Sequence, residues 1–233
     1  MSMLSSWVGG PVLRTGLTVI ITHRESLQAH SAFRLSLQTM LNLDVRSASD
    51  SDRHTVIGVI TLAFATDPMA RWAFPDPATY LAVMPQIAAA FGGNGFPHGS
   101  AHLIDGGMGA AMWLPPGVAP DNDTLGALTD THAPKDRIGD MMQVFEQMDR
   151  YHPPGPCWYL PLIGVDPAHQ GRGCGSALLR YALARCDRDG VPAYLESSNP
   201  RNVSLYERHG FVAIGKIQAG SSPTMLPMLR HPR

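Results

Sequence analysis

The sequence predicts a single α/β domain that begins near Leu43 and runs to the C-terminus. Two observations support this fold class. Segments with helical spacing of apolar residues alternate with short apolar strands, and near the C-terminus a strand, a glycine-rich loop and a helix follow one another. A chain of 233 residues with 44% apolar and 16% charged residues can bury a core without help from disulfides or metal. One domain with an extension suits this length better than two domains.

Composition also excludes several classes of partner. The 18 Lys and Arg and 19 Asp and Glu give a formal net charge of -1, so no global charge attracts nucleic acid or anionic lipid. The apolar runs are far shorter than the roughly 18 to 20 residues that a membrane span needs. Cys157, Cys174 and Cys186 lack C-x-x-C spacing, which predicts reduced thiols and no structural zinc. We therefore expect a soluble, cytoplasmic protein with no metal and with neither nucleic acid nor membrane as partner.

The first 42 residues differ in composition from the rest of the chain. They carry Arg14, Arg24 and Arg34 against the single acidic residue Glu25. A secretory signal fits poorly, because the apolar stretch 16–22 is short and no convincing cleavage site follows it. We expect residues 1–42 to be an extension, disordered or non-native, and residues 43–233 to be the folded domain.

Local patterns predict the elements of the first part of the domain. After a short strand at 43–46, a capping box of Ser49 and Asp52 begins a helix that Asp67-Pro68 ends. The elements expected next are a loop over 66–77, a helix over 79–91, a hairpin of strands 101–104 and 109–114, a loop over 115–134, and a helix over 135–151. The apolar face expected for the last of these helices contains Ile138, Met142, Phe145 and Met148.

An irregular strand is expected at residues 158–165. This run is densely apolar but contains Pro161, which cannot donate to a strand ladder and is rare inside a central strand. A bulge, or separation from one neighbouring strand, would reconcile Pro161 with burial. Either arrangement would leave backbone groups near Ile163 and Val165 free to bind a ligand.

The next segment, residues 166–176, has the features of an anion site. Gly171, Gly173 and Gly175 let a phosphate group approach the backbone, and the following helix presents unpaired N–H groups at its N-terminus. The dinucleotide-binding fingerprint Gly-x-Gly-x-x-Gly does not match from Gly171, because Ser176 occupies the position of the third glycine. A Walker loop fails as well, because no lysine lies between residues 136 and 215.

The pattern that does match is Gln170-x-x-Gly173-x-Gly175, which resembles the acyl-CoA pyrophosphate motif of the GNAT acetyltransferase family. The resemblance continues downstream, where a strand over 191–197 precedes an Asn199-(x)6-Tyr206-x-x-x-Gly210-Phe211 segment. Residues 192–202 resemble the puromycin-acetyltransferase-like branch, which acts on small molecules. The family resemblance implies a mixed sheet whose fourth and fifth strands splay apart, with flanking helices.

The same resemblance implies a set of residues for acetyl-CoA. The pantetheine arm would lie beside the fourth strand at Ile163, Gly164 and Val165. The pyrophosphate would lie on the loop residues, which are Gln170, Gly171, Arg172, Gly173, Cys174, Gly175 and Ser176. Asn199 can bind the cofactor arm in this family, but Asn-Pro is equally a helix cap.

Two residues are the candidates for chemistry. By resemblance, Tyr206 is the general acid that protonates the departing CoA thiolate, although a tyrosine on an amphipathic helix can also be an ordinary core residue. An alkylammonium must lose its proton before it can attack, and Glu196 on the fifth strand is the candidate base or amine anchor. A proton relayed by solvent is an alternative to Glu196.

The expected activity is acetyl transfer from acetyl-CoA to a primary amine of a small molecule, directly in a ternary complex. The acceptor pocket is expected around residues 72–77, Trp113, Tyr159 and Asp105. Alternatives are an acyl-CoA-binding regulatory module without turnover and a protein N-acetyltransferase. A homodimer is one possible assembly.

Overall fold

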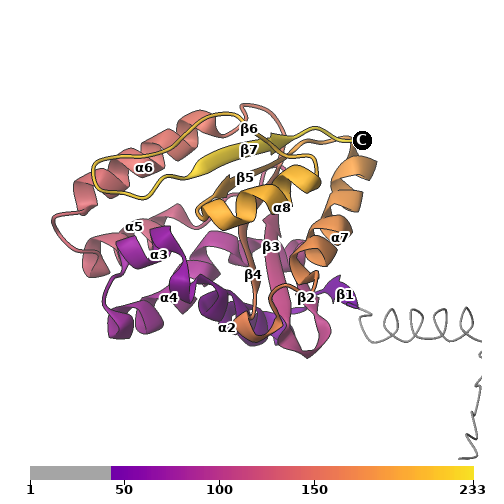
Figure 1. The fold of residues 1–233 in the computed structure, drawn as a ribbon, viewed down its shortest axis with the longest axis horizontal. Coiled ribbons are helices and arrows are strands. Elements are labelled where there is room, and N and C mark those ends of the chain that lie inside the picture. The colour runs from indigo at the N-terminus through magenta and orange to yellow at the C-terminus, as the bar shows by residue number, and fades with distance from the viewer. Residues whose placement is uncertain (1–42) are drawn as a thin grey trace, which may run out of the picture. The chain divides into compact units, whose positions relative to one another are not determined.

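The computed structural model describes residues 43–233, and the extension expected at 1–42 lies outside the described residues. The described residues form one mixed sheet with helices on both faces (Figure 1). The strands are β1 (Val45–Ser47), β2 (Ala101–Ile104), β3 (Gly109–Leu114), β4 (Trp158–Val165), β5 (Ala193–Ser197), β6 (Val212–Ala213) and β7 (Leu226–Arg230). The helices are α2 (Arg53–Ala63), α3 (Pro68–Ala73), α4 (Pro77–Gly92), α5 (Asn122–His132), α6 (Ile138–Tyr151), α7 (Cys174–Asp189) and α8 (Val203–Arg208).

The seven strands lie in the order β1-β2-β3-β4-β5-β7-β6. Neighbouring strands are antiparallel except β4 and β5, which form the parallel pair at the middle of the sheet. The hairpin strands β2 and β3 have the predicted bounds, and positive φ angles at Gly106 and Gly107 form the turn between them. The predicted mixed α/β fold is confirmed.

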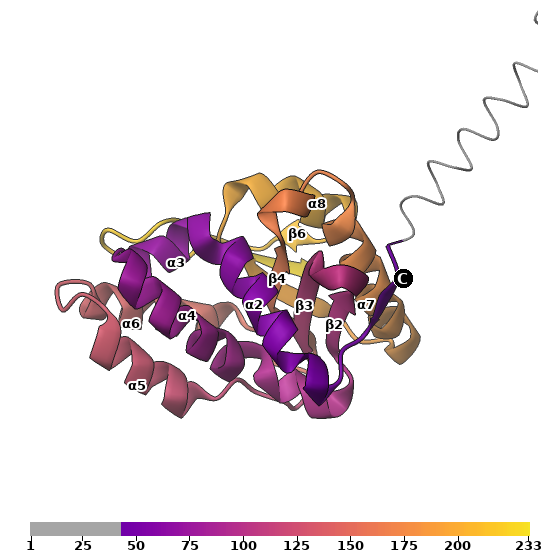
Figure 2. The same ribbon diagram turned by 90° about the horizontal axis from the view of Figure 1, so that it is seen from below.

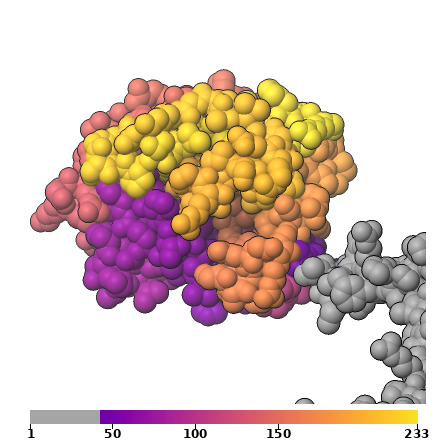
Figure 3. All heavy atoms as spheres, in the orientation of Figure 1, coloured from indigo at the N-terminus to yellow at the C-terminus, as the bar shows by residue number. Residues whose placement is uncertain are grey.

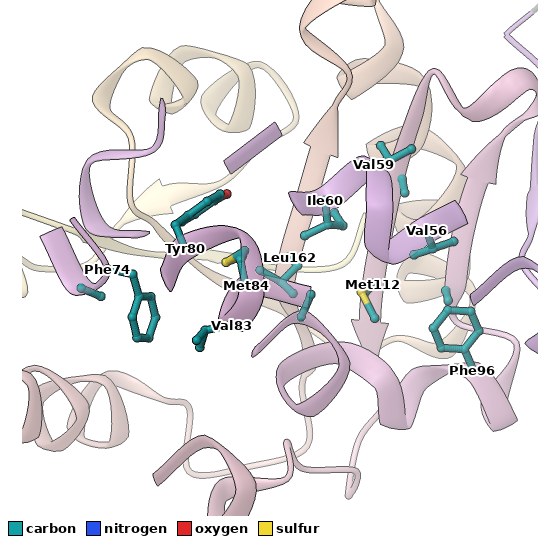
Figure 4. Packing of buried hydrophobic residues seen from close by; sticks show 14 of the residues in the cluster. Val56, Val59, Ile60, Phe74, Tyr80, Val83, Met84, Phe96, Met112 and Leu162 are labelled. Atoms are coloured by element: carbon teal, nitrogen blue, oxygen red, sulfur yellow. The ribbon is translucent and has the colours of Figure 1, made fainter. Parts of the chain in front are cut away.

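Each face of the sheet carries its own core. Helices α2 and α4 cover one face, where Ile60 and Met84 pack against Met112 and Leu162 of the strands (Figure 4). Helices α7 and α8 cover the other face, around the fully buried Trp113. Figure 2 shows α3, α4, α5 and α6 grouped at one end of the domain, away from α7. The site described below lies between these two groups of helices.

Two helices occupy segments expected to be loops. Asp67-Pro68 ends the preceding helical stretch as predicted, but Asp67 is also the N-cap of α3, since its side chain accepts from the backbone N–H groups of Met69 and Ala70. In the segment 115–134, Asp121 caps the unpredicted helix α5 through the backbone N–H of Thr124. Both expectations of loop were wrong because the cap residues were interpreted as turn residues.

The predicted face of α6 is confirmed at Ile138 and Met148, which pack against the core, but was wrong at Met142 and Phe145. The helix buries Met141 and Val144, whereas Met142 is 51% and Phe145 38% exposed. Several apolar residues lie one position apart on this helix, so spacing alone does not select the buried stripe. In the described part of the chain, no helix is both long and apolar enough to cross a bilayer, and no three potential metal-ligating side chains gather together.

Candidate active site

Strand β4 contains a bulge at Pro161. Against β3, Leu162 pairs with Met112, but the next registered pair is Tyr159 with Leu114, so β4 has one extra residue between them. The extra residue shifts the alternation of side chains. Leu162 faces the core under α2 and α4, while Leu160 faces the core under α7 although it has the same parity. The predicted irregularity at Pro161 is therefore present.

Beyond the bulge, β4 and β5 separate. Their parallel pairing is confined to Trp158 with Ala193 and Tyr159 with Tyr194, whereas β5 pairs with β7 along its whole length. The separation opens a gap beside residues 160–165 of β4. This is the splay of the fourth and fifth strands that the family resemblance implies.

The backbone of β4 offers hydrogen-bonding groups to this gap. The N–H of Asp166 donates to the carbonyl of Met108 at 3.0 Å, so Asp166 belongs to a hydrogen-bonded pair with β3. Because bonded and non-bonded positions alternate in an antiparallel ladder, the backbone groups of Ile163 and Val165 point away from β3, toward the gap. The side chain of Gln170 already donates to the Val165 carbonyl at 3.3 Å.

The glycine-rich loop follows the open end of this gap. Gly171 and Gly173 have φ angles of 75° and 86°, which favour glycine over any residue with a Cβ. Gly173 is the N-cap of α7, and the N–H of Ala177 is the first to bond within the helix, to the Gly173 carbonyl. The amides before Ala177 are therefore available to an anion at the N-terminus of a 16-residue helix.

One continuous cavity of about 760 Å³ joins the loop to the gap. Its lining includes all the residues expected to hold acetyl-CoA except Arg172, whose side chain is exposed at the loop. Both residues expected to carry chemistry, Tyr206 and Glu196, also line it. In Figure 3 the surface is recessed between the orange residues that follow β4 and the golden residues of α8.

Tyr206 lies on α8, at the face of the sheet covered by α7. The residue is 5% exposed, and burial, with a further contribution from the Asp67 carboxylate, raises the pKa of its hydroxyl well above the usual value. The phenol is therefore protonated near neutral pH. Its hydroxyl makes no hydrogen bond to any residue that the structure describes, so it is free to donate to a ligand.

Glu196 lies on β5, on the opposite face of the sheet from Tyr206. Its carboxylate accepts a hydrogen bond of 2.8 Å from the hydroxyl of Tyr159. Burial raises the pKa of Glu196 to about 7, although the hydrogen bond from Tyr159 works in the other direction. Glu196 and Tyr206 thus flank the gap. The pKa of the Glu196 carboxyl group is about 7, and the Tyr206 phenol is uncharged at neutral pH.

Asn199 and Cys174 line the cavity, and each also makes a hydrogen bond within the protein. The side chain of Asn199 accepts from the N–H of Arg201 at 3.1 Å, so Asn199 is the helix cap that its Asn-Pro sequence predicts. The Cys174 thiol is buried and directed at the His169 carbonyl, 3.7 Å away. Cys157 and Cys186 are free and buried as well.

Some of the residues expected around the acceptor lie elsewhere. Trp113 is fully buried under α7, and Asp105 lies in the β2–β3 turn, where Arg46 pairs with it at 2.9 Å. Tyr159 lies outside the cavity lining and contacts the site through the hydrogen bond that its hydroxyl donates to Glu196. Trp72 and Phe74 do line the cavity.

Sequence reasoning missed Asp67, a carboxylate of the cavity wall. Asp67 is only 6% exposed, and its Oδ2 accepts a 2.7 Å hydrogen bond from the hydroxyl of Ser198. The signal in the sequence was the Asp-Pro pair, which was interpreted only as a helix stop. Its position in the wall depends on the distant contact with Ser198.

Known proteins resemble this chain in both sequence and structure. Residues 140–211 match the model of the Acetyltransferase (GNAT) family. An uncharacterised N-acetyltransferase of Schizosaccharomyces pombe is 37% identical over 78 residues, which are 32% of this chain and 32% of that protein. A mycothiol acetyltransferase of Propionibacterium freudenreichii is 41% identical over 56 residues, 23% of this chain and 18% of the relative. The chain therefore matches about a third or less of the length of these curated relatives.

Among solved structures, one described as histone acetyltransferase HPA2 and related acetyltransferase from Corynebacterium glutamicum superposes with a TM-score of 0.58. It is 26% identical, and the match covers 81% of this chain and 96% of that one. The fold, the glycine-rich loop and the match to the family model all indicate the same similarity, which is to acetyltransferases of the GNAT type. Over residues 140–211, and in its fold, the chain is similar to the GNAT acetyltransferase family.

Proposed function

We propose that the protein is an acetyl-CoA-dependent N-acetyltransferase that acts on a primary amine of a small molecule. The observation that carries this proposal is the gap between β4 and β5. It begins at the glycine loop, is edged by the backbone groups of Ile163 and Val165 that point away from β3, and is flanked by Tyr206 and Glu196. A binding site for a diphosphate alone would need the loop but not this channel.

In this proposal each part of acetyl-CoA has its own contact surface. The pyrophosphate lies on the amides of residues 171–176, where the unpaired N–H groups of α7 favour an anion. The pantetheine arm runs along β4 and pairs with Ile163 and Val165, much as an additional strand would. This arrangement brings the thioester into the gap between the two chemical groups.

The two flanking residues balance the protons of the reaction. The amine reaches the site as an ammonium ion, and Glu196 removes a proton to expose the nitrogen lone pair. The nitrogen forms a bond to the thioester carbonyl carbon, and the carbon–sulfur bond then breaks. The Tyr206 hydroxyl gives its proton to the departing thiolate, while the N–H of Val165 is a suitable donor to the oxyanion. The nitrogen gives up its second proton through solvent, which restores the Tyr206 hydroxyl after it has protonated the thiolate, and Glu196 releases its own proton to solvent before the next turnover. The transfer is direct, with both substrates bound together.

A small-molecule acceptor is supported by the limited size of the cavity, about 760 Å³, and by the sequence over residues 192–202, which resembles the puromycin-acetyltransferase-like branch. The mycothiol acetyltransferase among the relatives is also named for a small molecule. A cytoplasmic location is supported by the three free cysteines.

The test is release of CoA thiol from acetyl-CoA over a panel of amines, monitored with a chromogenic thiol reagent. The proposal predicts amine-dependent thiol release, with initial-rate lines that intersect when both substrates are varied. Parallel lines would indicate a covalent acetyl-enzyme and would contradict direct transfer. Tight binding of acetyl-CoA without release by any amine would support the regulatory binding module instead.

A further inference from the structure

The cavity extends past the gap into a chamber whose walls are almost entirely apolar. The chamber is formed by side chains from α3, α4, α5 and α6, the helices grouped at one end of the domain (Figure 2). Five methionines line the cavity, among them Met69, Met84 and Met141, together with aromatic residues that include Trp72 and Phe91. We call this part of the cavity the helical chamber. Its thioether and aromatic surfaces offer dispersion contacts and no fixed polar pattern.

Two carboxylates stand where the helical chamber meets the gap. Ser198 follows Glu196 by two positions, just after the end of β5. Because its hydroxyl donates a hydrogen bond to Asp67, the Asp67 carboxylate lies beside the end of β5. The Asp67 carboxylate also contributes to the raised pKa of Tyr206, which indicates that it lies near the reacting end of the cavity. Asp67 and Glu196 are the only acidic residues among the described lining.

Neither carboxylate has a basic partner among residues 43–233. The ion pairs between described residues include neither Asp67 nor Glu196. Burial raises the pKa of both groups. A buried carboxylate without a counterion is costly, and a cationic ligand that binds between the two would relieve that cost. The two lining arginines, Arg201 and Arg208, belong to the segment that follows β5 and to α8.

We propose that the acceptor is an amine with a bulky apolar body, aryl or long alkyl, whose ammonium group binds at Asp67 and Glu196 while its body fills the helical chamber. This inference rests on the proposed acetyl transfer and adds the class of substrate to it. A polyamine or an amino sugar would leave its remaining polar groups unpaired against methionine and aromatic walls. The methionine-rich wall further implies that apolar bodies of different shape are accepted.

The first experiment compares amines that differ only in their body. The rate constant kcat/KM is measured for ethylamine, butylamine, hexylamine, octylamine and 2-phenylethylamine, with spermidine and glucosamine as hydrophilic members. The inference predicts that kcat/KM rises by up to about fourfold for each methylene that the chamber buries. It also predicts that spermidine and glucosamine rank below butylamine.

The second experiment tests the chamber wall with matched variants on one helix. Met141 is 6% exposed and lines the cavity, while the neighbouring Met142 is 51% exposed and does not. Met141→Gln should raise KM for octylamine about tenfold and leave KM for ethylamine nearly unchanged. Met142→Gln should alter neither value.

The third experiment tests the ammonium contact. Asp67→Asn preserves an N-cap side chain but removes the charge, and it should raise KM for octylamine about tenfold or more. Asp76→Asn is the control, because Asp76 caps α4 in the same way, through the N–H of Thr79 at 2.7 Å, but lies outside the cavity lining. The control should leave KM unchanged.

Equilibrium binding of each amine, measured by calorimetric titration, separates this inference from the proposed function. Met141-dependent binding of octylamine without thiol release would uphold the helical chamber and overturn the acetyl transfer. Thiol release that favours spermidine or glucosamine over octylamine would uphold the transfer and overturn the chamber. Equal effects of Met141→Gln and Met142→Gln would overturn the chamber as well.

Discussion

Removing the hydroxyl of Tyr206 isolates the proposed proton donor from the rest of the site. The substitution Tyr206→Phe keeps the ring, which packs against Phe211 with the ring centroids 6.1 Å apart. The hydroxyl bonds to no described residue, so its loss leaves no buried partner unsatisfied. We therefore expect the free energy of unfolding to change by less than about 1 kcal/mol.

The effect on turnover should be large. Burial keeps the Tyr206 phenol neutral, because its pKa is raised well above the usual value, so the proton it would donate is in place at neutral pH. A positioned general acid contributes about 10²- to 10⁴-fold to rate, or about 3 to 5 kcal/mol of barrier. We expect kcat to fall by that factor while the Kd for acetyl-CoA stays within about twofold, because the loop and the β4 backbone supply the binding contacts.

Thiol release measures kcat, and calorimetric titration measures the Kd for acetyl-CoA. Tyr181→Phe is the matched control, because Tyr181 is 43% exposed on α7 and meets the His102 ring edge to face, outside the cavity lining. Equal kcat in Tyr206→Phe and the parent protein would remove Tyr206 from the mechanism. A parallel loss of acetyl-CoA affinity would indicate a structural role.

Three further predictions concern other parts of the molecule. The carboxylate of Glu196 must be deprotonated to accept a proton, so kcat/KM should rise with pH through about 7, and Glu196→Gln should abolish that rise in a pH profile. Gly173→Val should abolish binding of acetyl-CoA in calorimetry, whereas Gly117→Val, at a similar φ of 83° in an exposed turn, should retain it. Deleting residues 1–39 should leave the Tm of the domain unchanged in differential scanning calorimetry, and a collapsed transition would contradict the assignment of those residues as an extension.

Local signals in the sequence were sufficient for much of the sheet and for the loop. Asp105-Gly106-Gly107 defined the β2–β3 turn because positive φ angles there require glycine. Pro161 predicted the bulge because proline cannot join the ladder on both sides. The capping box of Ser49 and Asp52 is present as expected, with the N–H of Ser49 donating to Asp52 at 2.8 Å.

Features that depend on long-range contacts were not predictable from the sequence. Asp67 becomes part of the cavity through Ser198, which lies 131 positions later in the chain. The buried face of α6 is selected by the elements packed against it, since the helix has apolar residues on neighbouring faces. Trp113 is an aromatic residue of the kind that often lines ligand pockets, but the register of β3 directs its side chain into the core under α7.

Acetyl transfer to an apolar amine is tested most directly by measuring both products of a single reaction. The parent protein is incubated with acetyl-CoA and octylamine, free CoA thiol is quantified by colour, and N-acetyloctylamine is quantified by mass spectrometry. Direct acetyl transfer should give equal amounts of the two products, formed only when both substrates are present. Thiol that accumulates without N-acetyloctylamine, or bound acetyl-CoA that is never consumed with any amine, would contradict it.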